Sequence, residues 1–157
     1  MIKKNPAYIK TLQLLARQPY SFFRLKKKLQ EKDFDPQEIE IALQKVRDLN
    51  YLCEKDYIFS RITSLMRRGH SAYLIAKRLK AEDQIIVTSH EIKKIFTEHN
   101  LTEENLIKEI INKKKPVAFK NETDKEKVKN KILRYLQNKG YNWDIISFLV
   151  DEEFKVP

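Results

Sequence analysis

The chain has 157 residues, of which 41% are apolar and 34% are charged. Its 32 Lys and Arg against 22 Asp and Glu give a formal net charge of +10, which favours a polyanionic partner: nucleic acid, an acidic protein surface or an anionic membrane. No apolar run approaches the roughly 20 residues of a membrane-spanning helix, and no secretion signal follows the basic Lys3 and Lys4, so we expect a cytoplasmic protein.

Helix signals are clear from the start of the chain. Asn5 and Pro6 predict an N-cap and a first helical turn, and the helix should run to about Gln18 before Pro19 ends it. Ser21 can cap a second helix, and the cap, proline and carboxylate within residues 35–38 open a third. The apolar residues expected to face inward from the first two helices are Ile9, Leu12, Leu15, Ala16, Phe22, Leu25 and Leu29. We therefore predict a three-helix unit over residues 1–53.

Two further units follow. In residues 54–101, a helix should end at Gly69, Ser71 should cap the next one, and Thr88 with Glu91 fits the capping box of a third. In residues 102–157, a helical connection of about 102–114 precedes a long helix that ends at Gly140 and a last helix from Asn142. Strand-like alternation of useful length is missing from the sequence, so the predicted fold class is all-α.

These units are copies of one pattern. The segment from Leu12 to Leu29 recurs fifty residues later, from Ile62 to Leu79, and a weaker copy lies a further 71 residues on, from Leu133 to Val150. Each copy has apolar residues at helical spacing on both sides of a turn and a cap. Stacked repeats of this kind form an extended surface instead of a catalytic cleft.

The sequence offers little for catalysis. Cys53 is the only cysteine, which excludes an internal disulfide and a cysteine-based metal framework, and the three histidines are too far apart for a local zinc site. The two glycines, Gly69 and Gly140, belong to no phosphate-binding loop. Paired carboxylates occur without a nucleophile, base or metal beside them. We expect a protein that is not an enzyme and that has no cofactor and no metal.

Some cations repeat together with the apolar frame. At the offset of fifty, Arg17 corresponds to Arg67, and the pair Lys27 and Lys28 corresponds to a second pair at 77 and 78. In stacked repeats such charges would form a stripe suited to nucleic acid, although each alone could simply solvate an outer helix face. The full set of candidate residues for binding DNA or a partner is Arg17, Arg24, Lys27, Lys28, Arg61, Arg67, Arg68, Lys77, Arg78 and Lys139.

Three large side chains share one position of the repeat. Tyr20, His70 and Tyr141 each precede the second helix of a copy, at its corner. They could plug the corners of their units, or they could face a partner. The sequence leaves both alternatives open.

The chain resembles the RecX family, bacterial regulators of the RecA recombinase, over almost its whole length. The residues that carry the resemblance are Tyr51-Leu52 with Glu54 and Asp56, Arg61 and Arg67-Arg68-Gly69 with Ile75 and Leu79, and Lys131-Ile132, Tyr135-Leu136 and Lys139-Gly140-Tyr141 with Ile145 and Ile146. Family members usually carry glycine where this chain has Asp33 and Asn50. They also carry two acidic residues directly after the position of Leu52, where this chain has Cys53-Glu54.

The resemblance implies three tandem three-helix repeats in an elongated, curved, right-angled helix stack. It also implies an inhibitor of RecA that lies in the groove of the RecA filament on single-stranded DNA, suppresses ATP hydrolysis and strand exchange, and so acts in homologous recombination, DNA repair and the SOS response. The expected partners are the RecA filament, single-stranded DNA and also double-stranded DNA, with no membrane, and the expected state is a monomer. An alternative is a stand-alone basic helical DNA-binding module, because corners such as Gln18 to Ser21 also suit helix-turn-helix readers.

Overall fold

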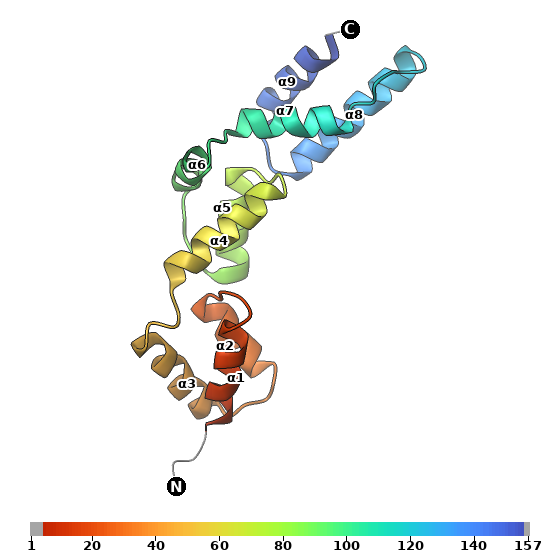
Figure 1. Cartoon of the computed structure of the whole chain (residues 1–157). Helices are drawn as coiled ribbons and strands as arrows, with labels where there is room; N and C mark the ends of the chain where they lie inside the picture. The colour runs from red at the N-terminus through yellow and green to blue at the C-terminus, as the bar shows by residue number, and fades with distance from the viewer. Residues whose placement is uncertain (1–4, 156–157) are drawn as a thin grey trace. The chain divides into compact units, whose positions relative to one another are not determined.

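A computed structural model describes residues 5–155, which contain nine α-helices and no β-strand (Figure 1). The helices are α1 (Pro6–Leu15), α2 (Phe22–Gln30), α3 (Pro36–Asp48), α4 (Glu54–Arg67), α5 (Ala72–Asp83), α6 (Ser89–Glu98), α7 (Glu103–Lys114), α8 (Glu122–Asn138) and α9 (Trp143–Lys155). The all-α helical repeat predicted from the sequence is therefore confirmed. None of these helices is long and apolar enough to span a membrane.

The predicted caps are in place. The side chain of Asn5 accepts a hydrogen bond from the backbone N–H of Tyr8 at 2.9 Å, and Ser21 and Ser71 cap α2 and α5 in the same way. The full capping box of Thr88 with its glutamate opens α6. Each such cap contributes about 1 kcal/mol, so local sequence signals fix most helix starts.

Within residues 5–155, the backbone is left-handed at six positions, which lie at the ends of helices. Gly69 and Gly140 have φ of +75° and +85°, and four residues other than glycine, among them Asp33 and Asn50, have φ between 54° and 57°. Asn and Asp tolerate this region better than other residues with a side chain. Asp33 and Asn50, which stand where the family usually has glycine, therefore adopt the left-handed backbone that favours glycine.

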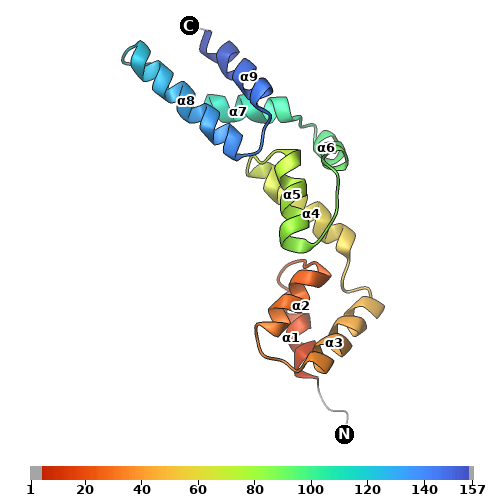
Figure 2. The same cartoon turned by 180° about the vertical axis from the view of Figure 1, so that it is seen from behind.

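The chain divides into two compact units, residues 1–61 and 62–157, so the division passes through α4. The predicted repeat limits of 1–53, 54–101 and 102–157 stay a prediction. Figures 1 and 2 show both units from opposite sides.

In the first unit, α1 packs chiefly against α3, and α2 packs against both. The core residues of α2 and α3 include Leu25, Leu29, Ile39 and Leu43, all of which are buried. The predicted inner stripe of α2 is thus confirmed at both leucines, while Phe22 lies half-buried at the edge of this core.

The predicted inner face of α1 is wrong in part: Leu12 and Leu15 are half-buried and Leu15 packs against the core, but the other two predicted residues are exposed. The helix buries Ala7, Thr11 and Leu14, whereas Ile9 is 44% exposed and Ala16 is also exposed. Thr11 can be buried because its hydroxyl donates to the carbonyl of Ala7 at 2.8 Å.

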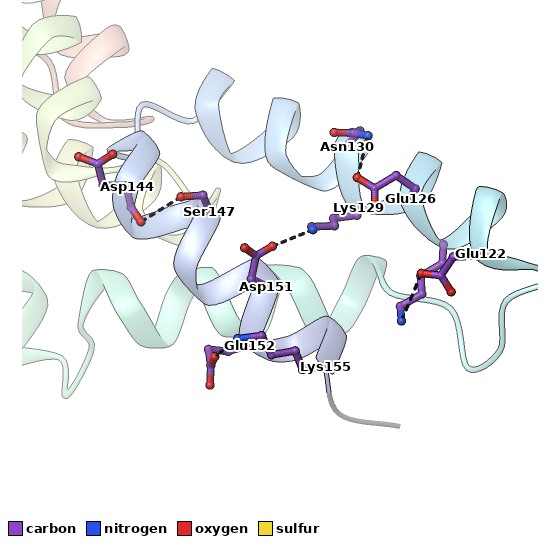
Figure 3. A network of polar contacts seen from close by, with 10 residues as sticks. Glu122, Glu126, Lys129, Asn130, Asp144, Ser147, Asp151, Glu152 and Lys155 are labelled. Atoms are coloured by element: carbon purple, nitrogen blue, oxygen red, sulfur yellow. Dashed lines mark hydrogen bonds and ion pairs between the residues drawn. The ribbon is translucent and has the colours of Figure 1, made fainter.

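In the second unit, α5 packs against α6, and the last three helices share one core. Ile107 and Ile111 place α7 in that core, so the segment predicted as a helical connection supplies the third helix of the last bundle. An ion pair of 2.8 Å between Lys129 and Asp151 also links α8 to α9 (Figure 3).

Candidate nucleic-acid interface

The corner between α4 and α5 is held by backbone hydrogen bonds. Its Gly69 N–H donates to the carbonyl of Met66 at 2.8 Å, and the next N–H, of His70, donates to Leu65 at 3.2 Å. This pair of bonds is the Schellman ending, which needs left-handed backbone at the glycine. The α8–α9 corner repeats it, with Gly140 bonded to Gln137.

The large residue at each corner is buried. Tyr20, His70 and Tyr141 are 7%, 7% and 6% exposed, so of the two alternatives left open by the sequence, they plug the corners. Burial raises the pKa of the Tyr141 phenol well above its ordinary value. These side chains shape the corners from inside.

Two of these corners contact each other within the second unit. The N–H of Ser71 donates to the carbonyl of Lys139 at 2.9 Å, and its hydroxyl donates to the carbonyl of Gly140 at 2.8 Å. Glu103, at the start of α7, accepts from the N–H of Ala72 at 2.8 Å. Figures 1 and 2 both show the α4–α5 loop against the α8–α9 loop.

The charges of three predicted cations act on His70 at this contact. The pKa of His70 is lowered from its ordinary value first by burial, then by the charge of Lys139, and further by Arg78 and Arg68, while a hydrogen bond to the Leu65 carbonyl opposes the shift. Arg68 comes from the loop after α4, Arg78 from α5 and Lys139 from the end of α8. We call Arg68, Arg78 and Lys139 the corner cluster.

The corner cluster is accessible and only partly neutralised. Arg68 is exposed, and the other two cations are half-buried. Arg78 lies 3.9 Å from a carboxylate oxygen of Glu82 one turn along α5, while Lys139 lies over the ring of Tyr135 at 5.4 Å. Such an exposed pair is weak, so most of the positive charge stays available to an anion.

The remaining candidates in the second unit are less informative. Arg67 and Lys77 are exposed, and neither forms an ion pair with the residues that the structure describes. Lys114 was missed by the sequence reasoning, although it lies 3.8 Å from the centre of the Tyr135 ring that Lys139 also approaches. Its only sequence signal is the run of three lysines at 113–115.

In the first unit, the predicted cations occupy several places. Arg17 is exposed in the loop after α1 and lines a hollow of about 370 Å³ with Tyr51 and Cys53. Lys27 and Lys28 lie in the last turn of α2, where they also offset the helix dipole. Arg24 and Arg61 are half-buried. That these charges continue the stripe of the corner cluster stays a prediction.

Metal chemistry has no support at this surface: within residues 5–155, no group of three or more His, Cys, Asp or Glu side chains could hold an ion. The structure therefore defines a helical repeat protein whose conspicuous site is a set of cations on a helix corner. Stacked helical repeats form extended surfaces, and cations on such a surface attract polyanions.

Comparisons with known proteins agree with the helical repeat fold. Residues 7–45 match the first three-helix domain of RecX, and residues 102–150 match its third three-helix domain. A regulatory protein RecX from Clostridium botulinum strain Eklund 17B is 30% identical over 165 residues, which cover 97% of this chain and 69% of that protein. The chain therefore belongs to the RecX family.

Other relatives and solved structures extend the likeness over most of the chain. A regulatory protein RecX from Syntrophotalea carbinolica is 26% identical over 98% of this chain and 99% of its own length. The crystal structure of RecX from Lactobacillus salivarius covers 93% of both chains with a TM-score of 0.61 at 18% identity. Another RecX crystal structure gives 0.64 at 19% identity, covering 92% of this chain and 70% of the other. At these identities, the structures support the fold alone.

Proposed function

We propose that the chain inhibits RecA by binding in the groove of the RecA filament on single-stranded DNA, where it suppresses ATP hydrolysis and strand exchange. Membership of a family of regulatory proteins supports a regulatory role. The observation that carries the finer proposal is the corner cluster, because Ser71 bonds to Gly140 and three cations from separate segments all act on His70 beside this contact.

The chemistry of the cluster suits phosphate. Arg68 and Arg78 can each offer a planar fork of N–H donors to an anion, and Lys139 adds a point charge. Hydrogen bonds to the backbone already hold the corner in the free protein. Binding therefore restricts mainly the side chains of the three cations. We propose DNA phosphate and the acidic surface of RecA as the anions bound, with the remaining cations of the predicted set extending the contact.

A triple charge reversal tests the assignment. In the variant Arg68→Glu, Arg78→Glu and Lys139→Glu, the formal net charge falls from +10 to +4. The control variant Lys94→Glu, Lys127→Glu and Lys131→Glu makes the same change at exposed lysines of α6 and α8 that are outside the predicted set. Comparing the two separates the cluster from the total charge.

The assay is RecA assembled on single-stranded DNA, with ATP hydrolysis and strand exchange measured as the chain is added. We expect the native chain and the control to inhibit both, the cluster variant to need at least tenfold more protein, and inhibition to weaken steeply with salt. Unchanged RecA activity with the native chain would refute the proposal. Equal loss in the two variants would refute the role of the cluster.

The alternative, a stand-alone DNA-binding module, predicts a different result. It requires a tight and sequence-selective complex with duplex DNA in the absence of RecA. Titrating a labelled duplex and a single-stranded oligonucleotide with the pure chain distinguishes the two, and we expect weak binding that depends on salt but not on sequence.

A further inference from the structure

The second unit also has a groove whose lining is largely apolar, in contrast to the cations of the corner cluster. This groove of about 970 Å³ is lined by residues of α5, α6, α7 and α9 and by the α8–α9 corner. Ligand sites in proteins typically measure about 300–1,000 Å³, so this groove has room for several side chains. Its apolar lining includes Tyr73, Ile145 and Phe148, which are 63%, 49% and 64% exposed.

Such exposure is unusual for large apolar side chains that gather in one place. Tyr73 comes from α5, while the other two lie on α9, so two separate helices present them to one groove. Soluble monomers rarely expose joined apolar surface unless it binds something. The groove is therefore the apolar surface of this unit to consider for an interaction.

The groove also contains a polar atom without a partner. Tyr141 lines it, and although this residue is 6% exposed, its hydroxyl forms no hydrogen bond within the described part of the chain. A buried hydroxyl that leaves its hydrogen bond unmade is costly to the free protein. A polar group of an occupant that reaches Tyr141 would remove this cost.

The charges around the groove indicate what the occupant carries. Lys93 forms an ion pair with Glu103 at 3.3 Å, and Lys108 forms an ion pair with Glu104 at 2.8 Å. This leaves Asp144 as the charged lining residue without an ion pair among the described residues. In Figure 3, its carboxylate points away from the ion pair that joins α8 to α9. A cation would complement it, whereas a phosphate would be repelled.

We propose that this groove binds an extended segment of a partner protein that carries a large apolar or aromatic side chain next to a lysine or arginine. The apolar side chain packs on Phe148 and Ile145, the cation pairs with Asp144, and a polar group of the segment bonds to the Tyr141 hydroxyl. This inference goes beyond the proposed function, because it requires neither RecA nor DNA.

A random library of phage-displayed 12-residue peptides provides the probe. The full chain is immobilised, enriched peptides are sequenced, and a synthetic peptide of the resulting consensus is titrated against the chain. We expect the consensus to contain an aromatic or large aliphatic residue beside Lys or Arg. Failure to enrich any family of peptides, or enrichment of peptides without an apolar anchor, would overturn the proposal.

Matched variants locate the binding. Ile145→Ser with Phe148→Ser should weaken the consensus peptide at least tenfold, and Ile86→Ser with Val117→Ser should not, although the latter residues are 84% and 107% exposed and lie outside the groove. Tyr141→Phe should weaken the peptide several-fold while the melting temperature stays equal or rises. Equal affinity for both double variants would overturn the assignment.

The cation is tested with a double-mutant cycle. Asp144→Asn and replacement of the peptide's Lys or Arg by Ala should each weaken binding several-fold, and together they should weaken it no further. Independent, additive losses would overturn the pairing. Competition by a thymidine oligonucleotide that persists in the triple charge reversal of the corner cluster would assign the groove to nucleic acid. Self-association lost in the Ile145 and Phe148 variant would assign it to a second copy, and either result would overturn the proposal.

Discussion

Replacing Gly140 by alanine should destabilise the second unit far more than the same change at Gly69. Both glycines have positive φ, +85° and +75°, so alanine should cost about 1–2 kcal/mol of backbone strain at either position. The surroundings differ. At Gly140, a Cβ atom would lie 2.6 Å from Cβ of Leu74 and 2.7 Å from Oγ of Ser71.

These neighbours at Gly140 can barely move. Cβ of Leu74 is fixed to the backbone of α5, and Ser71 both caps that helix and donates to the carbonyl of Gly140. Overpacking should therefore add about 1–3 kcal/mol, for a total of about 2–5 kcal/mol. At Gly69, the close atom is Cδ1 of Ile110, at 2.9 Å, and the end of this side chain can rotate away. The total cost of Gly69→Ala should therefore stay near that of the backbone strain alone.

Urea unfolding monitored by fluorescence measures the difference. Trp143 is the only tryptophan of the chain and begins α9, so its signal reports the second unit. Asn100→Gly is the control, because Asn100 has φ of 55° and is exposed, and we expect a change within about 0.5 kcal/mol. Equal losses for Gly69→Ala and Gly140→Ala would refute the close packing of the two corners.

Three further outcomes follow from burial and charge. In the native chain, the lowered pKa keeps folded His70 neutral, so below pH 6.5 the unfolded state takes up the proton first and acid favours unfolding. His70→Tyr copies the residue of the other corners and should therefore lose less stability below pH 6.5 in urea titrations. Asp151→Asn should cost under about 1 kcal/mol in the same assay, because the pair with Lys129 is partly exposed. Leu25→Asp should abolish the helical circular dichroism of the first unit by burying a charge, while the Trp143 signal of the second unit stays folded.

Signals that act over a few residues were readable from the sequence. Asn5, Ser21, Ser71 and the capping box at Thr88 each satisfy N–H groups within three residues, so the residue types alone predict the helix starts. The face of α1 was not readable, because its apolar residues surround the helix and the buried Thr11 is polar. Packing against α3 decides that face, and packing is a long-range property.

The candidate surfaces show the same limit. The offset of fifty residues identified Arg78 as one of a repeated set, but it could not show that Lys139 also acts on His70, which depends on the contact between Ser71 and Gly140. The groove was missed because Tyr73 and Phe148 are distant in the sequence and each alone has the spacing of a core residue. Whether a corner residue plugs or protrudes likewise required the coordinates.

The pKa of His70 can report whether an anion binds at the corner cluster. The cations that are proposed to attract phosphate also lower the pKa of His70, so a phosphate bound among them should offset their charge and raise that pKa toward its ordinary value. A pH titration of the His70 ring by NMR, with and without a thymidine oligonucleotide, measures the change, and the rings of His90 and His99 serve as internal references. The rise should vanish in the triple charge reversal and persist in its control. An oligonucleotide that binds without moving the pKa of His70 would place the DNA elsewhere on the chain.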